Sequence, residues 1–242
     1  MALLETFERQ GNWLFKHRGG LPLAILVAGL AVHVHDRLRG LPTINTLEWV
    51  ALAISLSGLC LRAYAVGHAP PNTSGRNTRR GQVADSLNTT GVYSVVRHPL
   101  YLGNFLAWLG VALLPCNPWF AALACLVFWL YYERVMFAEE QFLRGKFGES
   151  YASWAVRTPA FVPSPRLFVR PARKFSWRKV LRDEKNGLLA LFLAFSAFDL
   201  AGWCAGGGAY SLFLAAATAA SLLLYLVARH LKRKTRALEE RQ

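Results

Sequence analysis

The sequence predicts an all-α membrane protein, a polytopic bundle of about six transmembrane helices. Hydrophobic residues make up 54% of the 242 positions, and the mean hydropathy is +0.25, both above the values of ordinary globular domains. A soluble protein has no use for many segments that expose hydrocarbon to water, so the lipid bilayer is the expected solvent. The apolar runs lie near 21–35, 47–67, 101–115, 118–138, 187–204 and 209–228.

The lengths of these runs set what each can do. The second, fourth and sixth approach the roughly 20 residues that cross a bilayer core. The first and third have only about 15, which predicts short, tilted or partly re-entrant helices. Pro115 and Pro118 separate the third and fourth runs. Because proline cannot continue a helix, these two runs are expected to form an antiparallel helical hairpin.

Charge is sparse and strongly unbalanced, with 28 Lys and Arg against 14 Asp and Glu and a net charge of +14. Such a surplus faces nucleic acid or anionic lipid headgroups, and the apolar runs favour lipid, so no nucleic-acid partner is expected. A six-span threading places 24 of the 28 basic residues on one side. We therefore predict an integral protein of a bacterial cytoplasmic membrane, with both termini and the segments 68–100 and 139–186 in the cytoplasm.

Two charged residues lie one to two turns inside the predicted cytoplasmic boundary, Arg62 in the second run and Glu133 in the fourth. They are predicted to pair, because charges buried in a membrane usually find a partner. Snorkelling to the interface is the alternative for Arg62 and for Arg134. Four cysteines lie in or beside apolar runs without metal-ligand spacing, so we expect free thiols and no metal site. These are Cys60, Cys116, Cys125 and Cys204.

The most informative stretch, 91–104, stands at the predicted cytoplasmic mouth of the third run. Pro99 suits the first turn of a helix, where its missing N–H costs nothing. The helix N-terminus there presents unpaired N–H groups and a partial positive charge, so it can hold a carboxylate or phosphate, with Arg97 and His98 beside it. An ordinary juxtamembrane arginine with an interfacial tyrosine is the alternative interpretation.

A second stretch follows the fourth run and begins with Glu139 and Glu140. A carboxylate near the C-terminus of a helix opposes the macrodipole. Pairing of Glu140 with Arg144 at helical spacing offsets only roughly 0.2–0.5 kcal/mol. We therefore interpret at least one of the two glutamates as a binding residue.

Together these residues resemble the isoprenylcysteine carboxyl methyltransferase and phospholipid methyltransferase superfamily, over roughly 88–163. Three elements match in order: Arg-His-Pro-x-Tyr-x-Gly at 97–103, an apolar helical hairpin, and Glu-Glu-x-x-Leu-x-x-x-Phe-Gly-x-x-Tyr at 139–151. The triplet Arg-Thr-Pro at 157–159 also matches the Arg-Val-Pro of the isoprenylcysteine branch. Ala160 departs from the basic or larger residue of many bacterial members, and two further spans follow the core, which leaves the substrate open.

The resemblance implies an enzyme that transfers a methyl group from S-adenosylmethionine to a lipid or lipid-linked acceptor at the cytoplasmic face. Catalytic roles are implied for Arg157, beside an anionic nucleophile, and for Glu140, which with Glu139 or His98 is a candidate general base for an amine acceptor. Neither a metal nor a covalent nucleophile is required for such a displacement. The cofactor-binding positions carried over are Arg97, His98, Pro99, Tyr101, Gly103, Glu139 and Glu140.

The chain divides by sequence into three parts. N-terminal membrane helices and a polar loop occupy 1–87, the methyltransferase core with its hairpin occupies 88–165, and a basic linker with two C-terminal spans occupies 166–242. The basic tract from Arg166 to Lys185 is either a solvated linker or an interfacial segment that holds anionic headgroups. The pattern gives no prediction of the oligomeric state.

Three other functions are weighed against the methyltransferase. An NADPH-dependent membrane reductase of sterols or enones carries a similar Arg-His-x-x-Tyr-x-Gly element, but the adjacent glutamates and the short chain favour the methyltransferase. A haem-binding bundle needs two axial histidines that face each other. His33 and His35 lie near the external end of the first run. His68 and His98 lie on the cytoplasmic side, so no pair emerges. A non-enzymatic scaffold or transporter is the last alternative, because Asp199 lies within the fifth run.

Overall fold

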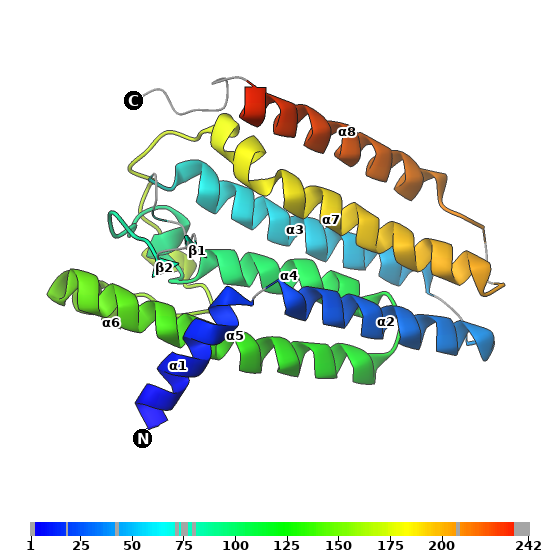
Figure 1. Cartoon of the computed structure of the whole chain (residues 1–242), viewed down its shortest axis with the longest axis horizontal. Coiled ribbons are helices and arrows are strands. Elements are labelled where there is room, and N and C mark those ends of the chain that lie inside the picture. The colour runs from blue at the N-terminus through cyan, green and yellow to red at the C-terminus, as the bar shows by residue number, and fades with distance from the viewer. Residues whose placement is uncertain are drawn as a thin grey trace.

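The computed structural model describes residues 3–17, 19–41, 44–70, 73, 77–78, 81–206 and 209–234. The elements in this part of the chain are α1 (Leu3–Lys16), α2 (Gly20–Leu38), α3 (Asn45–His68), β1 (Asn77–Thr78), β2 (Gly81–Gln82), η1 (Val92–Ser94), α4 (Pro99–Leu113), α5 (Pro118–Phe147), α6 (Glu149–Arg157), η2 (Pro165–Leu167), α7 (Trp177–Cys204) and α8 (Leu212–Lys234). The long axis of the molecule is followed by six of these helices, namely α2, α3, α4, α5, α7 and α8 (Figure 1).

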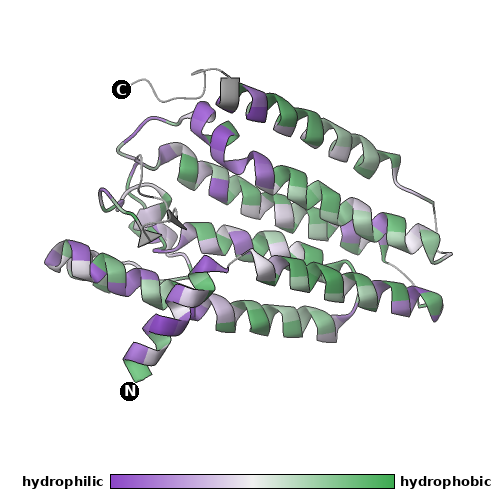
Figure 2. Cartoon of the chain, viewed as in Figure 1, coloured by the Kyte–Doolittle hydropathy of each residue, from purple (hydrophilic) through white to green (hydrophobic). Residues whose placement is uncertain are grey.

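Five helices of the described part are long and apolar enough to cross a membrane, namely α2, α3, α5, α7 and α8. The sixth, α4, is apolar but has only 15 residues, as its short run predicts. Figure 2 shows hydrophobic residues along the bundle and hydrophilic residues gathered where α1, α6 and the strands lie. The prediction of an all-α, polytopic membrane bundle is confirmed. We call the end with α1, α6, β1 and β2 the loop end, and the other the far end.

The predicted hairpin of α4 and α5 is confirmed. Cys116 has a φ of 58°, in the left-handed region, and reverses the chain between the helices. The side chain of Asn117 then caps α5 by accepting a hydrogen bond from the N–H of Phe120 at 3.0 Å. Pro118 occupies the first turn, where no N–H is needed.

Small residues let α3 and α4 approach closely. A Cβ on Gly103 would lie 2.7 Å from the carbonyl oxygen of Gly58 and 2.5 Å from Cγ of Arg62. One turn away, the hydroxyl of Ser55 donates to the carbonyl of Ala107 at 2.8 Å. Backbones that meet this closely gain dispersion contacts, which are the main attraction between helices in lipid.

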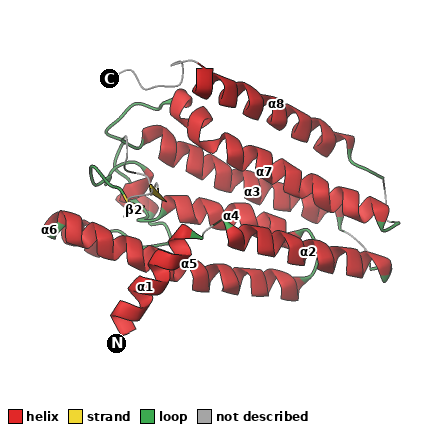
Figure 3. Ribbon diagram, in the orientation of Figure 1, coloured by secondary structure: helices red, strands yellow, loops and turns green. Residues whose placement is uncertain are grey.

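Two short helices at the loop end are absent from the sequence prediction (Figure 3). The amphipathic α1 buries Gly11 and Phe15 against α5, and leaves Leu3 and Trp13 exposed. α6 turns back from the end of α5 at Gly148, whose φ of 53° favours glycine. Neither helix carries a run long enough to stand out as a span, which explains why the hydropathy pattern does not show them.

Part of the basic tract packs against the C-terminus of α3. The N–H of Ser176 donates to the carbonyl of Gly67 at 3.0 Å, and the ring of Phe175 covers the same glycine. The buried ammonium of Lys179 donates to the carbonyls of Ala69 at 2.5 Å and Pro70 at 3.0 Å. These carbonyls end a helix and attract a cation. α7 therefore begins ten residues before its apolar run.

The predicted pair of Arg62 and Glu133 is wrong. Arg62 instead binds Glu184 of α7 through two bonds, Nε at 2.8 Å and Nη2 at 2.7 Å. Glu133 lies on a more exposed face of α5, where its carboxylate is 3.7 Å from Nη1 of the neighbouring Arg134. The early start of α7 brings Glu184 beside α3, which a prediction based on apolar runs alone cannot anticipate.

The largest hydrophobic cluster joins α3, α4, α7 and α8, so the core crosses both boundaries of the three-part division. That division stays a prediction about the sequence. The members of the cluster are Ala51, Leu52, Val111, Leu114, Leu191, Ala194, Phe195, Phe198 and Leu214.

Candidate functional site

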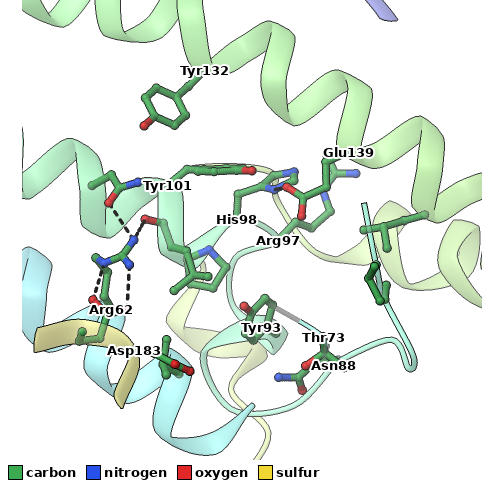
Figure 4. Close-up of a pocket in the computed structure, with 18 of the residues that line it drawn as sticks. Arg62, Thr73, Asn88, Tyr93, Arg97, His98, Tyr101, Tyr132, Glu139 and Asp183 are labelled. Atoms are coloured by element: carbon green, nitrogen blue, oxygen red, sulfur yellow. Dashed lines mark hydrogen bonds and ion pairs between the residues drawn. The ribbon is translucent and has the colours of Figure 1, made fainter. Parts of the chain in front are cut away.

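A cavity of about 650 Å³ lies at the loop end, and we call it the loop-end cavity (Figure 4). Its walls come from α3, the 83–88 loop, η1, the first turns of α4, the last turns of α5, and α6. The first turns of α7 and Lys232 of α8 close it. Segments far apart in the sequence therefore meet around one space, whose volume falls within the roughly 300–1,000 Å³ of ligand pockets.

The start of α4 is held in place by the chain that follows α6. The N–H of Arg97 donates to the carbonyl of Pro159 at 2.9 Å, and that of His98 to Ala160 at 3.2 Å. Pro99 then takes the first helical position and is fully buried. This clamp fixes the two side chains before the helix begins.

Two glutamates of α5 bind the side chains of this segment. Glu140 accepts from Nε2 of His98 at 2.9 Å and from Nη1 of Arg97 at 3.3 Å. Nδ1 of His98 lies 3.7 Å from a carboxylate oxygen of Glu139. The imidazole, whose side chain is only 5% exposed, thus sits between two carboxylates. Its ring stacks on Tyr101 with centroids 5.6 Å apart.

Three residues that line the cavity carry a buried donor without a well-directed hydrogen bond among the described residues: Arg97 at Nε, Tyr151 at its hydroxyl and Trp154 at its indole N–H. The Tyr151 hydroxyl nevertheless interacts with Glu140 and Arg97, so the indole of Trp154 is the clearest unpaired donor of the three. Burial raises the pKa of the Tyr151 phenol, and the nearby Glu140 carboxylate raises it further. That phenol stays neutral and keeps its proton. Because a buried unpaired donor costs roughly 1–3 kcal/mol, the indole N–H of Trp154 calls for an acceptor that the described residues do not supply.

The opposite wall carries a second charged cluster, formed around Arg62. Beyond its two bonds to Glu184, Arg62 donates through Nη1 to Oδ1 of Asn104 at 2.8 Å. Beside it, Asp183 binds Arg182 at 3.1 Å. Tyr93 of η1 lines the same space, and burial raises its pKa, with a smaller contribution from the charge of Glu139. The wall formed by α7 is thus polar and largely paired.

The structure brings together most, but not all, of the sequence-predicted site residues. Arg97, His98, Pro99, Tyr101 and Glu139 line the loop-end cavity. The other three, Glu140, Gly103 and Arg157, are not among the lining residues.

Glu140 stands behind His98, which it orients. Gly103 lies beneath Arg62, in the contact between α3 and α4. Arg157 is exposed at the end of α6 and is not among the lining residues. Its Nε donates to the carbonyl of Ser153 on its own helix at 3.2 Å.

The sequence analysis missed the Arg62 cluster, the first turns of α7 and the indole of Trp154. A signal existed for the last: Tyr151 and Trp154 are three residues apart, which places them on one face of a helix. The sequence signal for the first turns of α7 is weak, because the polar residues 182–186 precede the apolar run and resemble a linker. Within the described residues, no group of three or more His, Cys, Asp or Glu could hold a metal ion.

Residues 49–150 match the family described as Phospholipid methyltransferase. The chain is 32% identical over 162 residues to the cobalt-zinc-cadmium resistance protein CzcN of Cupriavidus metallidurans, covering 65% of this chain and 68% of that protein. It belongs to this family of membrane methyltransferases.

Two relatives in the same family are named for their reaction. Identity is 33% over 126 residues with protein-S-isoprenylcysteine O-methyltransferase B of Arabidopsis thaliana, which covers 50% of this chain and 64% of that enzyme. It is 29% over 146 residues with the rat protein-S-isoprenylcysteine O-methyltransferase, 58% of this chain and 51% of that enzyme. The chain thus spans about half to two thirds of these relatives. No solved structure matches it significantly.

The family match covers only part of the loop-end cavity. It includes α3 from Trp49 onward, η1, α4 and α5, and therefore the network of Arg97, His98 and Glu140. Trp154, the first turns of α7 and Lys232 lie beyond the matched residues. The match thus includes the network around His98 but not the residues of α6, α7 and α8 that complete the cavity.

Proposed function

We propose that this protein is an S-adenosylmethionine-dependent methyltransferase that acts on a lipid or lipid-linked acceptor. The observation that carries the proposal is the loop-end cavity, in which a fixed network of His98, Arg97 and Glu140 stands beside the unpaired indole N–H of Trp154. Membership of the methyltransferase family supports the reaction type.

The residues around the cavity fit S-adenosylmethionine by their chemistry. The N-terminus of α4 with Arg97 would hold the carboxylate, and Glu139 would hold the ammonium. The unpaired indole of Trp154 would donate to a nitrogen or oxygen acceptor of the adenosine part, and the nearby phenol of Tyr151 could do the same. Buried aromatic faces, such as that of Tyr101, suit a sulfonium cation.

When bound, the cofactor supplies a methyl group already activated on a sulfonium. The protein then has to align the acceptor and exclude water, which is the larger part of such catalysis. The clamp between the start of α4 and the chain after α6 holds these groups in place. For an amine acceptor, His98 and the glutamates are the candidate bases; for an anionic one, Glu140 serves to orient His98.

Arg157 is proposed to bind an anionic acceptor at the rim of the cavity. It ends α6 two residues before Pro159, whose carbonyl binds Arg97, so its backbone is close to the site although its side chain is exposed. Lysine cannot reproduce a bidentate fork, so Arg157→Lys should lower turnover by roughly one to three orders of magnitude, with cofactor affinity nearly unchanged. Arg170→Lys is the matched exposed control. Near-normal transfer by Arg157→Lys and Arg157→Ala would remove Arg157 from the site and favour an amine acceptor.

The orientation follows from the charge bias. We propose that the loop end faces the cytoplasm of a bacterial cell, with both termini on that side. Single cysteines at 77 and 206, in a background without the four native cysteines, test the threading with a membrane-impermeant thiol reagent. Labelling of both from the same side of the membrane would contradict it.

The experiment that tests the reaction class is titration calorimetry of the purified protein with S-adenosylhomocysteine and with NADPH. Binding of the first with no detectable binding of the second is the expected result. The opposite result would favour the membrane reductase, and heat from neither would favour a scaffold or transporter.

A further inference from the structure

A second cavity, of about 360 Å³, lies at the far end of the bundle. It is formed by the last turns of α2, the first turns of α3, the last turns of α7 and the start of α8. Figure 1 shows these segments together, away from α1, α6 and the strands. We call it the far-end cavity. It shares no lining residue with the loop-end cavity.

The far-end cavity combines an apolar wall with ionisable side chains from three helices. The ionisable residues are His33 and Arg37 of α2, Glu48 of α3 and Asp199 of α7. The apolar wall consists of Leu52, Leu114, Phe195, Phe198, Phe213 and Leu214. A site with this composition suits an amphipathic ligand with a charged head.

The charged side chains of this cavity make no direct ion pair with one another. Nε of Arg37 is buried without a hydrogen-bond partner, and no ion pair among the described residues includes Arg37, Glu48 or Asp199. Glu48 interacts with Asp199 and with Arg37 only through longer-range electrostatics. Charged groups near a bilayer core are costly without close partners, so a ligand that brings an anion to Arg37 and a cation to the two carboxylates would be favoured.

Asp199 accepts a hydrogen bond through one carboxylate oxygen, and its other oxygen remains open to a donor. Its Oδ2 accepts the N–H of Ser211 at 2.8 Å and so ties α7 to the start of α8. Its other oxygen has no hydrogen bond within the described residues. Gly202, one turn on, keeps the space open: a Cβ there would lie 3.1 Å from Nε2 of His33 and 3.9 Å from Nε of Arg37.

Aromatic side chains around this end place the cavity at the depth of lipid headgroups. Trp49 and Phe213 line the mouth, with ring centroids 5.2 Å apart, and are 58% and 50% exposed. Trp203 and Tyr210 are also exposed at this end. Trp and Tyr gather at the boundary between hydrocarbon and headgroups.

We propose that the far-end cavity binds the headgroup of a phospholipid that carries a primary amine, such as phosphatidylethanolamine. Arg37 binds the phosphate, and Glu48 with the free oxygen of Asp199 binds the ammonium. An anionic lipid would leave two carboxylates without a cation and add a repelling charge. A ligand that is only cationic would leave Arg37 without a hydrogen-bonded anion, with Glu48 as a more distant electrostatic neighbour. A headgroup with both charges satisfies all three residues, and the apolar wall receives part of an acyl chain.

The test is native mass spectrometry of the full chain in detergent with equal amounts of phosphatidylethanolamine, phosphatidylglycerol or phosphatidylcholine. We expect retention of the ethanolamine lipid at least about tenfold above the glycerol lipid, and above the choline lipid, which has no N–H to donate. Arg37→Gln should lower this retention by about tenfold or more, and Glu48→Gln should abolish the preference. Arg39→Gln, at an exposed arginine two residues on, is the matched control and should change nothing.

Several outcomes overturn the proposal. Equal retention of the three lipids by the unaltered protein does so without any variant, and so does equal retention by Arg37→Gln and Arg39→Gln. Soluble phosphoethanolamine that displaces the lipid at similar concentration would show that the apolar wall contributes nothing and would overturn the lipid as the ligand. Size-exclusion elution of each variant shows that it is folded, and the result is independent of whether the loop-end cavity transfers methyl groups.

Discussion

The two ends of the bundle hold charged cavities of opposite kinds. At the loop end, Arg62, Arg97 and His98 each bind a glutamate, and the remaining unpaired groups are neutral or single donors. At the far end, the side chains of Arg37 and Glu48 make no ion pair within the described residues and interact only through longer-range electrostatics. The first arrangement is held by ion pairs within the protein, which suits the proposed catalytic site. The second depends on a ligand to complete it.

This difference bears on function because the two ends also differ in their match to the family. The network of His98 and Glu140 lies within residues 49–150, whereas most of the far-end cavity comes from α2, α7 and α8. The proposed methyl transfer and the proposed lipid binding can therefore belong to separate parts of one chain. Equivalent substitutions at the two ends should therefore differ in their effect on protein stability and on ligand affinity.

The largest expected effect comes from removing one carboxylate at each end. Glu140→Gln weakens or removes the partners of His98 and Arg97, so we expect a loss of stability of about 2–4 kcal/mol and of most S-adenosylhomocysteine affinity. Glu48→Gln removes no partner in the described structure, so stability should change by less than about 0.5 kcal/mol. Unfolding in detergent, followed by tryptophan fluorescence, measures both. Equal losses would mean that the far end has an ion pair of its own.

A double-mutant cycle on Arg62 and Glu184 has the next largest effect. Each change to alanine leaves its partner charged and unpaired, so each should cost about 2–3 kcal/mol, and the pair together less than the sum by at least about 1 kcal/mol. Arg62→Ala with Glu133→Ala is the control and should be additive, because Glu133 lies beside Arg134 instead. Additive losses for Arg62 and Glu184 would contradict the bidentate pair. Arg37→Ala at the far end, by contrast, should cost less than about 1 kcal/mol without added lipid, because it removes only a longer-range attraction to Glu48.

The failed pairing of Arg62 with Glu133 shows what the sequence could and could not predict. Hydropathy and prolines predicted the spans and the hairpin, because those depend on local composition. The motif predicted that Arg97, His98, Tyr101 and Glu139 meet at one cavity. The partner of Arg62 depends on where α7 starts and on which helix it packs against. Those are tertiary properties, and the polar residues before the apolar run gave no periodic signal for them.

The same limit applies to Gly103, which the motif assigned to cofactor binding and the structure places beneath Arg62. Gly103→Ala should destabilise the protein by about 1–3 kcal/mol, because the new Cβ would meet Gly58 and Arg62 on α3. Gly145→Ala is the control, since no atom lies within 4 Å of its added Cβ and alanine favours the helix. Normal stability with weaker cofactor binding in Gly103→Ala would instead support the direct role.

The smallest expected effect concerns the unpaired donors of the loop end, and it separates a binding role from a structural one. Trp154→Phe keeps an aromatic ring in the buried position but removes an N–H that makes no hydrogen bond within the described protein. Stability of the free protein should therefore stay within about 0.5 kcal/mol or rise slightly, because an unsatisfied donor is removed. Affinity for S-adenosylhomocysteine should fall by a factor of about 3 to 10, the value of one hydrogen bond near 1 kcal/mol. Trp119→Phe, at an 85% exposed tryptophan of the far end, should change neither quantity. A loss of stability without a loss of affinity would show that the indole N–H has a partner in the protein, and the loop end would then hold one donor fewer for a ligand.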